Sequence, residues 1–170
     1  MNLSYLKKFY SIIFLTGVVM IAVTLLGLTF NLTEEKILEQ EHSQFLAHMA
    51  KIFPDMTHFE YENDIYILYN EEGLEGYAFV ASAAGYSGNI KIMVGLEDKE
   101  TVKGIVIMSH TETPGIGTRI LDPPFISQFE GMEIDLIKSN VDTLTGATVS
   151  SKAVIDAVSK AAKEKVALLS

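Results

Sequence analysis

The sequence predicts an α+β fold, in which an antiparallel sheet packs against helices and follows a single N-terminal transmembrane helix. Three observations predict this fold. The chain has an uncharged apolar run near its start, several short β-type runs separated by turn residues in its middle, and an amphipathic segment at its end. Runs this short, with connections of only a few residues, favour neighbouring strands that pair in opposite directions.

The apolar run extends from Ile12 to Phe30 without a charge, which is about the 20 residues that cross a bilayer core. Lys7 and Lys8 precede it and acidic residues follow it, so the N-terminus is predicted to lie in the cytoplasm. A cleaved signal peptide is the alternative, but its apolar region is usually only about 7–15 residues long, and no small-residue cleavage site follows. The predicted divisions are a cytoplasmic N-terminus (1–10), a transmembrane helix (11–30), a juxtamembrane helix (31–54) and an extracytoplasmic domain (55–170).

The juxtamembrane helix is predicted from apolar residues that recur at helical spacing between Ile37 and Ile52, and Pro54 ends the pattern. Four strands are then expected, separated by turn residues rich in Gly, Asn, Asp and Glu. In the fourth strand the alternation of aliphatic residues slips around Gly104, which predicts a bulge. The expected strands are 65–69, 74–83, 90–96 and 102–110.

The last third of the chain is expected to be mostly helical. A short helix (125–129) follows Pro123-Pro124, and a further strand is predicted over 132–137. The final helix is expected to begin with Ser150 or Ser151 as its cap. Its apolar residues share one broad side, so it is predicted to pack on the sheet.

The composition excludes several classes of function. The net charge is −9, and the 13 Lys and Arg residues are spread along the chain, which argues against a nucleic-acid surface. The chain has no cysteine, so it offers no thiolate for an iron–sulfur cluster or for thiol catalysis. His42 and His48 are six residues apart and lie on different helix faces, and we predict no metal site. A redox role would need a bound organic cofactor.

The segment from Asp142 to Thr148, with the sequence DTLTGAT, is the most informative motif. Gly146 permits a tight turn and Ala147 adds little bulk. Thr148 stands where the first amides of a helix converge, and these amides can bind a phosphate. Taken alone, Thr148 could equally be an ordinary helix cap. The segment resembles the D-x-x-S/T-G-A-S/T signature of the FMN-binding domain in the G subunit of the Rnf complex and in the C subunit of the sodium-pumping NADH:quinone oxidoreductase.

This resemblance implies that FMN is joined to Thr148 by a phosphoester, which a separate flavin transferase installs. It also implies that Thr145, Gly146 and Ala147 belong to the cofactor-binding segment. Asp142 is expected to serve transferase recognition or a turn bond.

A second motif, His110 to Gly117 with the sequence HTETPGIG, resembles the H-x-E-T-P-G-L/I-G loop of the same family. Gly85-Tyr86-Ser87-Gly88 resembles the family element just upstream. The resemblance implies that Glu112 and Thr113 lie near the flavin ring or its ribityl chain, and His110 is a weaker candidate. The alternative for these residues is an ordinary loop whose polar groups bond their own backbone. Arg119 is the single arginine of the chain, and a surface salt bridge is expected for it.

The three segments span residues 85–151, and residues 119–131, which continue the chain after the second motif, look more like the Rnf protein than its quinone-reductase counterpart. The resemblance implies an electron-transfer subunit of a membrane-bound, ion-translocating ferredoxin:NAD oxidoreductase, with covalent FMN and other membrane and redox subunits as partners. No nucleophile–base set or nucleotide loop appears, so the chain is not expected to be catalytic alone. The alternatives are a stand-alone membrane flavoprotein for extracytoplasmic electron transfer, a chain like the C subunit of the quinone reductase, and a flavin-free binding or assembly module.

Overall fold

The computed structural model describes residues 3–169, with side chains at residues 10, 12–27 and 40–169. The chain divides into two compact units, residues 1–44 and 45–170. The first unit consists of most of the helix α1 (Leu3–Ile52), which continues into the second unit from Phe45. Among the residues that the structure describes, none of the helices combines the length and the apolar character that a membrane crossing requires.

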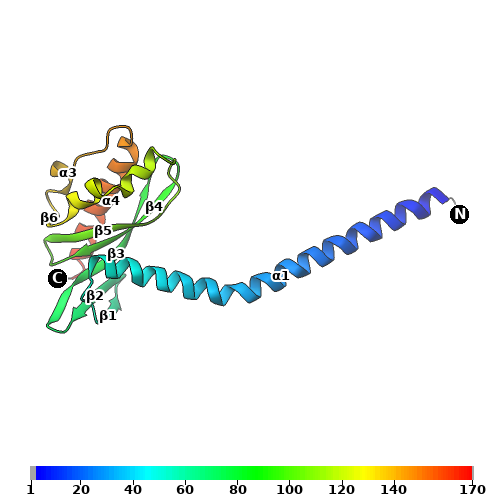
Figure 1. Ribbon diagram of the computed structural model, residues 1–170, viewed down its shortest axis with the longest axis horizontal. Coiled ribbons are helices and arrows are strands. Elements are labelled where there is room, and N and C mark those ends of the chain that lie inside the picture. The colour runs from blue at the N-terminus through cyan, green and yellow to red at the C-terminus, as the bar shows by residue number, and fades with distance from the viewer. Residues whose placement is uncertain (1–2, 170) are drawn as a thin grey trace. The chain divides into compact units, whose positions relative to one another are not determined.

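The second unit contains a six-stranded sheet in which the strand order follows the chain order (Figure 1). Every neighbouring pair is antiparallel, which confirms the predicted sheet. The predicted bulge is also confirmed, because Gly95 pairs with Gly104 and Leu96 with Val102, leaving Lys103 as an extra residue. The strands are β1 (His58–Glu62), β2 (Ile65–Asn70), β3 (Gly73–Ala84), β4 (Asn89–Leu96), β5 (Thr101–His110) and β6 (Met132–Glu133).

Three sequence-based expectations need correction. The strand β1 was not predicted, although Asn63 and Asp64 both have positive φ angles, as the two-residue turn between β1 and β2 requires. The strand predicted over 132–137 is only two residues long, because a turn follows Glu133 and Ile137 begins the short helix α3 (Ile137–Asn140). The last helix, α4 (Thr148–Val166), begins earlier than expected, with Ala147 rather than Ser150 or Ser151 as its N-cap.

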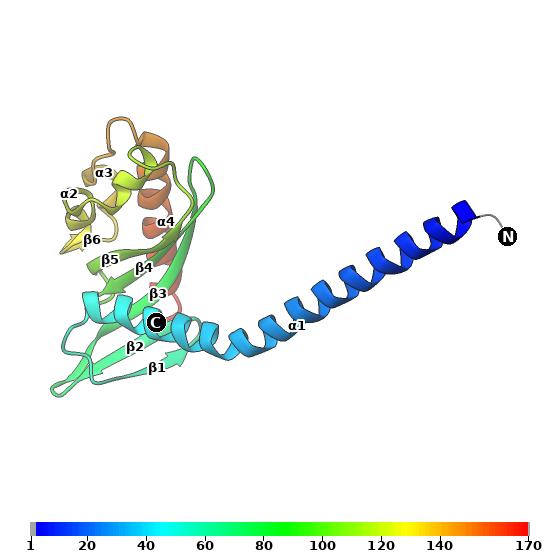
Figure 2. The ribbon, with the colours of Figure 1, turned by 45° about the vertical axis from the view of Figure 1, so that its right-hand side comes forward.

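Each face of the sheet is covered by helical structure, as the rotated view also shows (Figure 2). Alternate residues of β3, β4 and β5, such as Phe79, Ile92 and Ile105, pack with α4 and with the segment around α2 (Pro123–Ile126). The residues between them, such as Met93, pack with Met49 and the other side chains at the end of α1. The period-two alternation of the strands therefore builds two apolar layers, one on each face.

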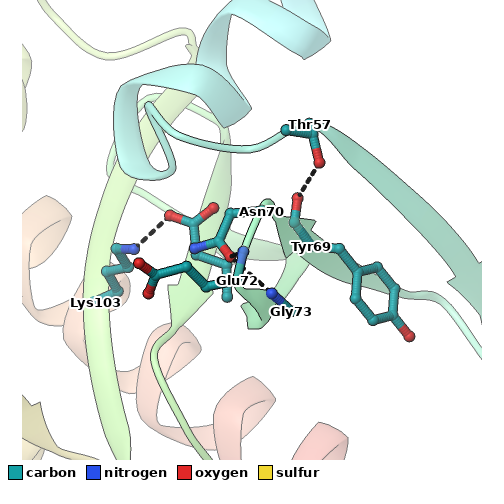
Figure 3. A network of polar contacts seen from close by, with 7 residues as sticks. Thr57, Tyr69, Asn70, Glu72, Gly73 and Lys103 are labelled. Carbon is teal, nitrogen blue, oxygen red and sulfur yellow. Dashed lines mark hydrogen bonds and ion pairs between the residues drawn. The ribbon is translucent and has the colours of Figure 1, made fainter.

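The face that packs with the end of α1 is held by close backbone packing and by polar contacts. A Cβ at Gly95 would lie 2.7 Å from the ring of the fully buried Phe53, so the ring rests directly on the strand backbone. Lys103 lies 4.6 Å from the centre of that ring and 2.8 Å from the Glu75 carboxylate. Figure 3 shows this ion pair beside the turn between β2 and β3, where the Asn70 side chain accepts hydrogen bonds from the backbone N–H groups of Glu72 and Gly73.

The same view shows the Thr57 hydroxyl donating to the Tyr69 carbonyl oxygen over 3.1 Å (Figure 3). Asp98 holds the turn between β4 and β5 in the way that Asn70 holds the turn between β2 and β3. Its carboxylate accepts from the N–H groups of Glu100 at 2.8 Å and Thr101 at 2.7 Å. The hydrogen bond from the Glu100 N–H is the largest of the causes that lower the pKa of Asp98.

Candidate functional site

The segment before α4 forms a type II turn. The Ala147 N–H donates to the Leu144 carbonyl oxygen over 2.9 Å, and Gly146, the third residue of the turn, has a φ angle of +85°. Thr145, the second residue, is not among the described residues with positive φ. These features define the type II geometry and explain why glycine stands at position 146.

The turn delivers Thr148 to the first position of α4 with an exposed side chain. The Thr148 hydroxyl has a long hydrogen bond of 3.4 Å to the Leu144 carbonyl oxygen. The N-cap residue Ala147 provides no side-chain hydrogen bond, so the first amides of α4 have no side-chain cap. Such amides carry the positive end of the helix dipole and bind anions.

A cavity of about 360 Å³ opens beside Thr148. Its size falls within the range of small-molecule sites. Three segments that are distant in the sequence line it. They are the β3–β4 hairpin with Tyr86, the loop after β5 with Glu112, Thr113, Ile116 and Gly117, and residues 146–150.

Glu112 joins these three segments and is only 4% exposed. One carboxylate oxygen accepts from the Ser87 N–H over 3.2 Å, and the other accepts from the Ser150 hydroxyl over 2.6 Å. A Cβ at Gly85 or at Gly117 would contact a carboxylate oxygen at an impossible distance. Glycine at both positions therefore makes room for the buried carboxylate.

Thr113 and His110 occupy different surroundings. Thr113 is exposed and lines the cavity, and its hydroxyl lies 3.0 Å from the Ser87 hydroxyl. His110, at the end of β5, accepts the Glu112 N–H at Nδ1 over 3.2 Å. The cavity thus brings together Gly146, Ala147, Thr148, Glu112 and Thr113 of the predicted set, and its lining does not include His110 or Thr145.

Some residues at the site were not predicted from the sequence. Tyr86, Ile116 and Val149 line the cavity with apolar side chains that are 74%, 56% and 56% exposed. Exposed apolar groups around a cavity are typical of a ligand site, because the ligand removes them from water. The available signal was their place in the three family-like segments: Tyr86 lies in Gly85–Gly88, Ile116 in the second motif, and Val149 directly after the first.

Arg119 makes two contacts. The expected surface salt bridge is present, and its partner is Asp122, with 3.7 Å between the charged atoms. Its Nη1 also donates to the Thr145 carbonyl oxygen over 2.7 Å, which was not predicted. The segment after β5 therefore contacts the chain on both sides of Thr148 in the sequence. Arg119 bonds Thr145, which precedes Thr148, and Glu112 bonds Ser150, which follows it.

Comparison with known proteins identifies a match to the FMN-binding domain over residues 85–163, which contains the whole cavity. The chain is 31% identical over 160 residues to the G subunit of the ion-translocating oxidoreductase complex of Methanosarcina acetivorans, covering 83% of this chain and 85% of that protein. It is 29% identical over 174 residues to the protein of the same name from Aliivibrio fischeri strain MJ11, covering 82% and 81%.

Two solved structures share the fold. The crystal structure of Shewanella oneidensis NqrC superposes with a TM-score of 0.52 at 24% identity, over 61% of this chain and 60% of that chain. The C subunit of the Na(+)-translocating NADH-quinone reductase from Parabacteroides distasonis gives a TM-score of 0.51 at 22% identity, over 60% and 61%. These likenesses support the α+β architecture, and this chain spans about three fifths of either protein.

Proposed function

Because the chain belongs to the family of Rnf G subunits and contains their FMN-binding domain, we propose that it relays electrons through an FMN joined covalently to Thr148. The chain is a redox subunit of an ion-translocating oxidoreductase complex. The proposed reaction of that complex is electron transfer between ferredoxin and NAD. Bound FMN would supply the redox chemistry, and the protein would hold and surround it.

The observation that carries the proposal is the uncapped start of α4 beside an exposed hydroxyl. A phosphoester on the Thr148 oxygen would place its negative charge near the first amides of the helix, where the dipole favours it. To form the ester, the hydroxyl loses its proton and bonds to the phosphorus of an activated flavin nucleotide, whose bond to the leaving group breaks. The proposed transferase would catalyse this step.

The side chains of the cavity suit different parts of FMN. The apolar walls formed by Tyr86, Ile116 and Val149 fit a flat conjugated ring and would exclude water from it. The proposal retains Thr145, Gly146, Ala147, Glu112, Thr113 and His110 as the cofactor-binding set. Glu112 and Thr113 supply the polar side of the cavity, and His110 and Thr145 support it from outside its lining.

We further propose that residues 11–30 anchor the protein as a single transmembrane helix. The supporting observations are the uncharged run from residue 12 to residue 30 and the lysines that precede it. This topology places the N-terminus in the cytoplasm and the FMN-binding domain, proposed over 55–170, outside it. The partners are then the other membrane and redox subunits of the complex.

The test of the proposed function is the intact mass of the chain purified from a host that contains the flavin transferase. We expect the mass of the polypeptide plus one FMN less one water. The denatured protein is expected to fluoresce in a gel, because a covalent flavin survives denaturation. A chain with the polypeptide mass and no fluorescence would support the flavin-free module instead. Co-purification with membrane subunits separates the complex from a stand-alone flavoprotein.

The carboxylate of Glu112 is expected to tune the flavin. A negative charge near the ring disfavours the addition of electrons, so Glu112→Gln should raise the midpoint potential of the attached FMN. An electrostatic effect of about 1 kcal/mol corresponds to a shift on the order of 20 mV for a two-electron couple. A spectroelectrochemical titration of the modified variant measures it. An unchanged potential would limit Glu112 to a structural role.

A further inference from the structure

We propose that Arg119 is a positioning residue that fixes the orientation of the Thr145–Gly146 peptide and thereby the placement of Thr148. Its importance for the flavin rests on the proposed function, whereas its effect on the turn does not. Arg119 lies outside both motifs and outside the cavity lining. The inference comes from the atom to which it donates.

Type I and type II turns differ mainly in the middle peptide, which is rotated by about half a turn between them. In this turn the middle peptide joins Thr145 to Gly146, and its carbonyl oxygen belongs to Thr145. Arg119 Nη1 donates to this oxygen over 2.7 Å. The bond therefore stabilises the orientation that gives Gly146 its φ angle of +85°. Rotation of the peptide would break the bond.

The guanidinium comes from a well-anchored segment. Arg119 lies in the 3-10 helix Gly117–Leu121, whose Ile120 is fully buried in the core. The Arg119 N–H donates to the Ile116 carbonyl oxygen over 3.2 Å, and the Arg119 carbonyl oxygen accepts from the Asp122 N–H over 3.0 Å. The core therefore holds the backbone from which the side chain reaches the turn.

Of the two contacts of Arg119, the one with Thr145 is the stronger. The Asp122 contact is 3.7 Å long between side chains that are 45% and 52% exposed, and such a pair contributes little. The Thr145 contact is a short hydrogen bond from a charged donor, which is stronger than a neutral one. The turn is also held at Leu144, whose N–H donates to the buried Ser151 hydroxyl over 3.0 Å. Arg119 holds the middle peptide of the turn, which the hydrogen bonds of Ser151 do not reach.

Arginine also suits the charge that this turn would carry after modification. The guanidinium group is a cation that directs several N–H groups from one plane. A Cβ at Gly146 would lie 4.0 Å from Arg119 Nη1, so the cation lies against the turn itself. The positive charge therefore stands beside the segment that would bear the negative phosphoester.

The test measures hydrogen exchange of the Ala147 amide in the unmodified chain, produced without the transferase. Arg119→Met, which keeps an apolar stem but loses charge and donors, is expected to speed this exchange about tenfold. Arg119→Lys keeps the charge and one donating group, so its Ala147 amide should exchange at a rate between those of the native chain and Arg119→Met. Asp122→Asn is the matched control, because it removes the ion pair and leaves the Thr145 bond, and it should exchange like the native chain. Core amides of β4 report that each variant is folded.

Equal exchange in the native chain and in Arg119→Met would overturn the inference, and so would an equal increase in Asp122→Asn. A second readout uses the modified chain, in which the fluorescence anisotropy of the attached flavin should decay faster in Arg119→Met than in Asp122→Asn. Failure of the proposed function would appear separately, as a native chain without the FMN mass. The exchange experiment would still decide the role of Arg119.

Discussion

Thr148→Val is expected to abolish the mass increment of FMN and the in-gel fluorescence completely while leaving the protein folded. The valine side chain has nearly the shape of threonine but has no oxygen to bond to phosphorus. Thr148 is exposed and its hydroxyl makes only one long hydrogen bond, so the free energy of unfolding should change by about 0.5 kcal/mol or less. Intact mass and denaturant unfolding measure the two effects.

Two matched variants make this result specific to the hydroxyl at position 148. Thr148→Ser keeps a hydroxyl at the helix start and should retain the increment. Thr143→Val removes an exposed hydroxyl at a variable position of the same motif and should also retain it. An increment that persists in Thr148→Val would move the attachment to another residue.

Glu112→Ala is expected to destabilise the domain by about 2–4 kcal/mol, because it leaves two donors without their acceptor and opens a small cavity. The donors are the Ser87 N–H and the buried Ser150 hydroxyl, which come from different segments. The loss should also loosen the contact between the β3–β4 hairpin and the start of α4. Urea denaturation measures the change.

Glu112→Gln is the control for the same position. Its amide keeps one acceptor oxygen for Ser87, and its NH2 group can donate to the Ser150 hydroxyl, which can accept as well as donate. It should therefore destabilise by about 1 kcal/mol or less. If Glu112→Ala were as stable as the glutamine variant, the buried carboxylate would not hold the three segments together.

The sheet could be predicted because its central strands alternate clearly and are separated by short turns. Ile90, Ile92 and Val94 share one face as the pattern predicted. The strand β1 was missed because its five residues, HFEYE, include two glutamates and no aliphatic residue. Its signal was the Asn63-Asp64 pair, which favours a two-residue hairpin.

The segment after residue 132 was predicted less well because its apolar residues do not distinguish a strand from a short helix. Ile134 and Ile137 are both buried, but they lie in a turn and at the start of α3 rather than in one strand. The start of α4 was misplaced because serine is a common cap. The Ser151 hydroxyl instead bonds the Leu144 N–H and the Ala147 carbonyl oxygen from inside the helix.

At the site, the motifs were enough to predict that Thr148 lies where the first amides of a helix converge and that Gly146 permits a tight turn. They could not give the contacts that join distant segments. The bond between Arg119 and Thr145 spans 26 residues, and the bond between Glu112 and Ser150 spans 38. Such contacts depend on how the loop after β5 folds back onto α4, which no local pattern encodes.

A sheet whose strand order follows the chain has its first and last strands at its two edges. Open edges can recruit a strand from a neighbouring molecule, and short edge strands and charged side chains oppose this. At one edge, β1 carries Glu60 and Glu62, and at the other, β6 is only two residues long. The charged edge strand β1 therefore offers no run of apolar residues as a template for fibril-like growth, and crowding among like domains does not favour polymerisation through it.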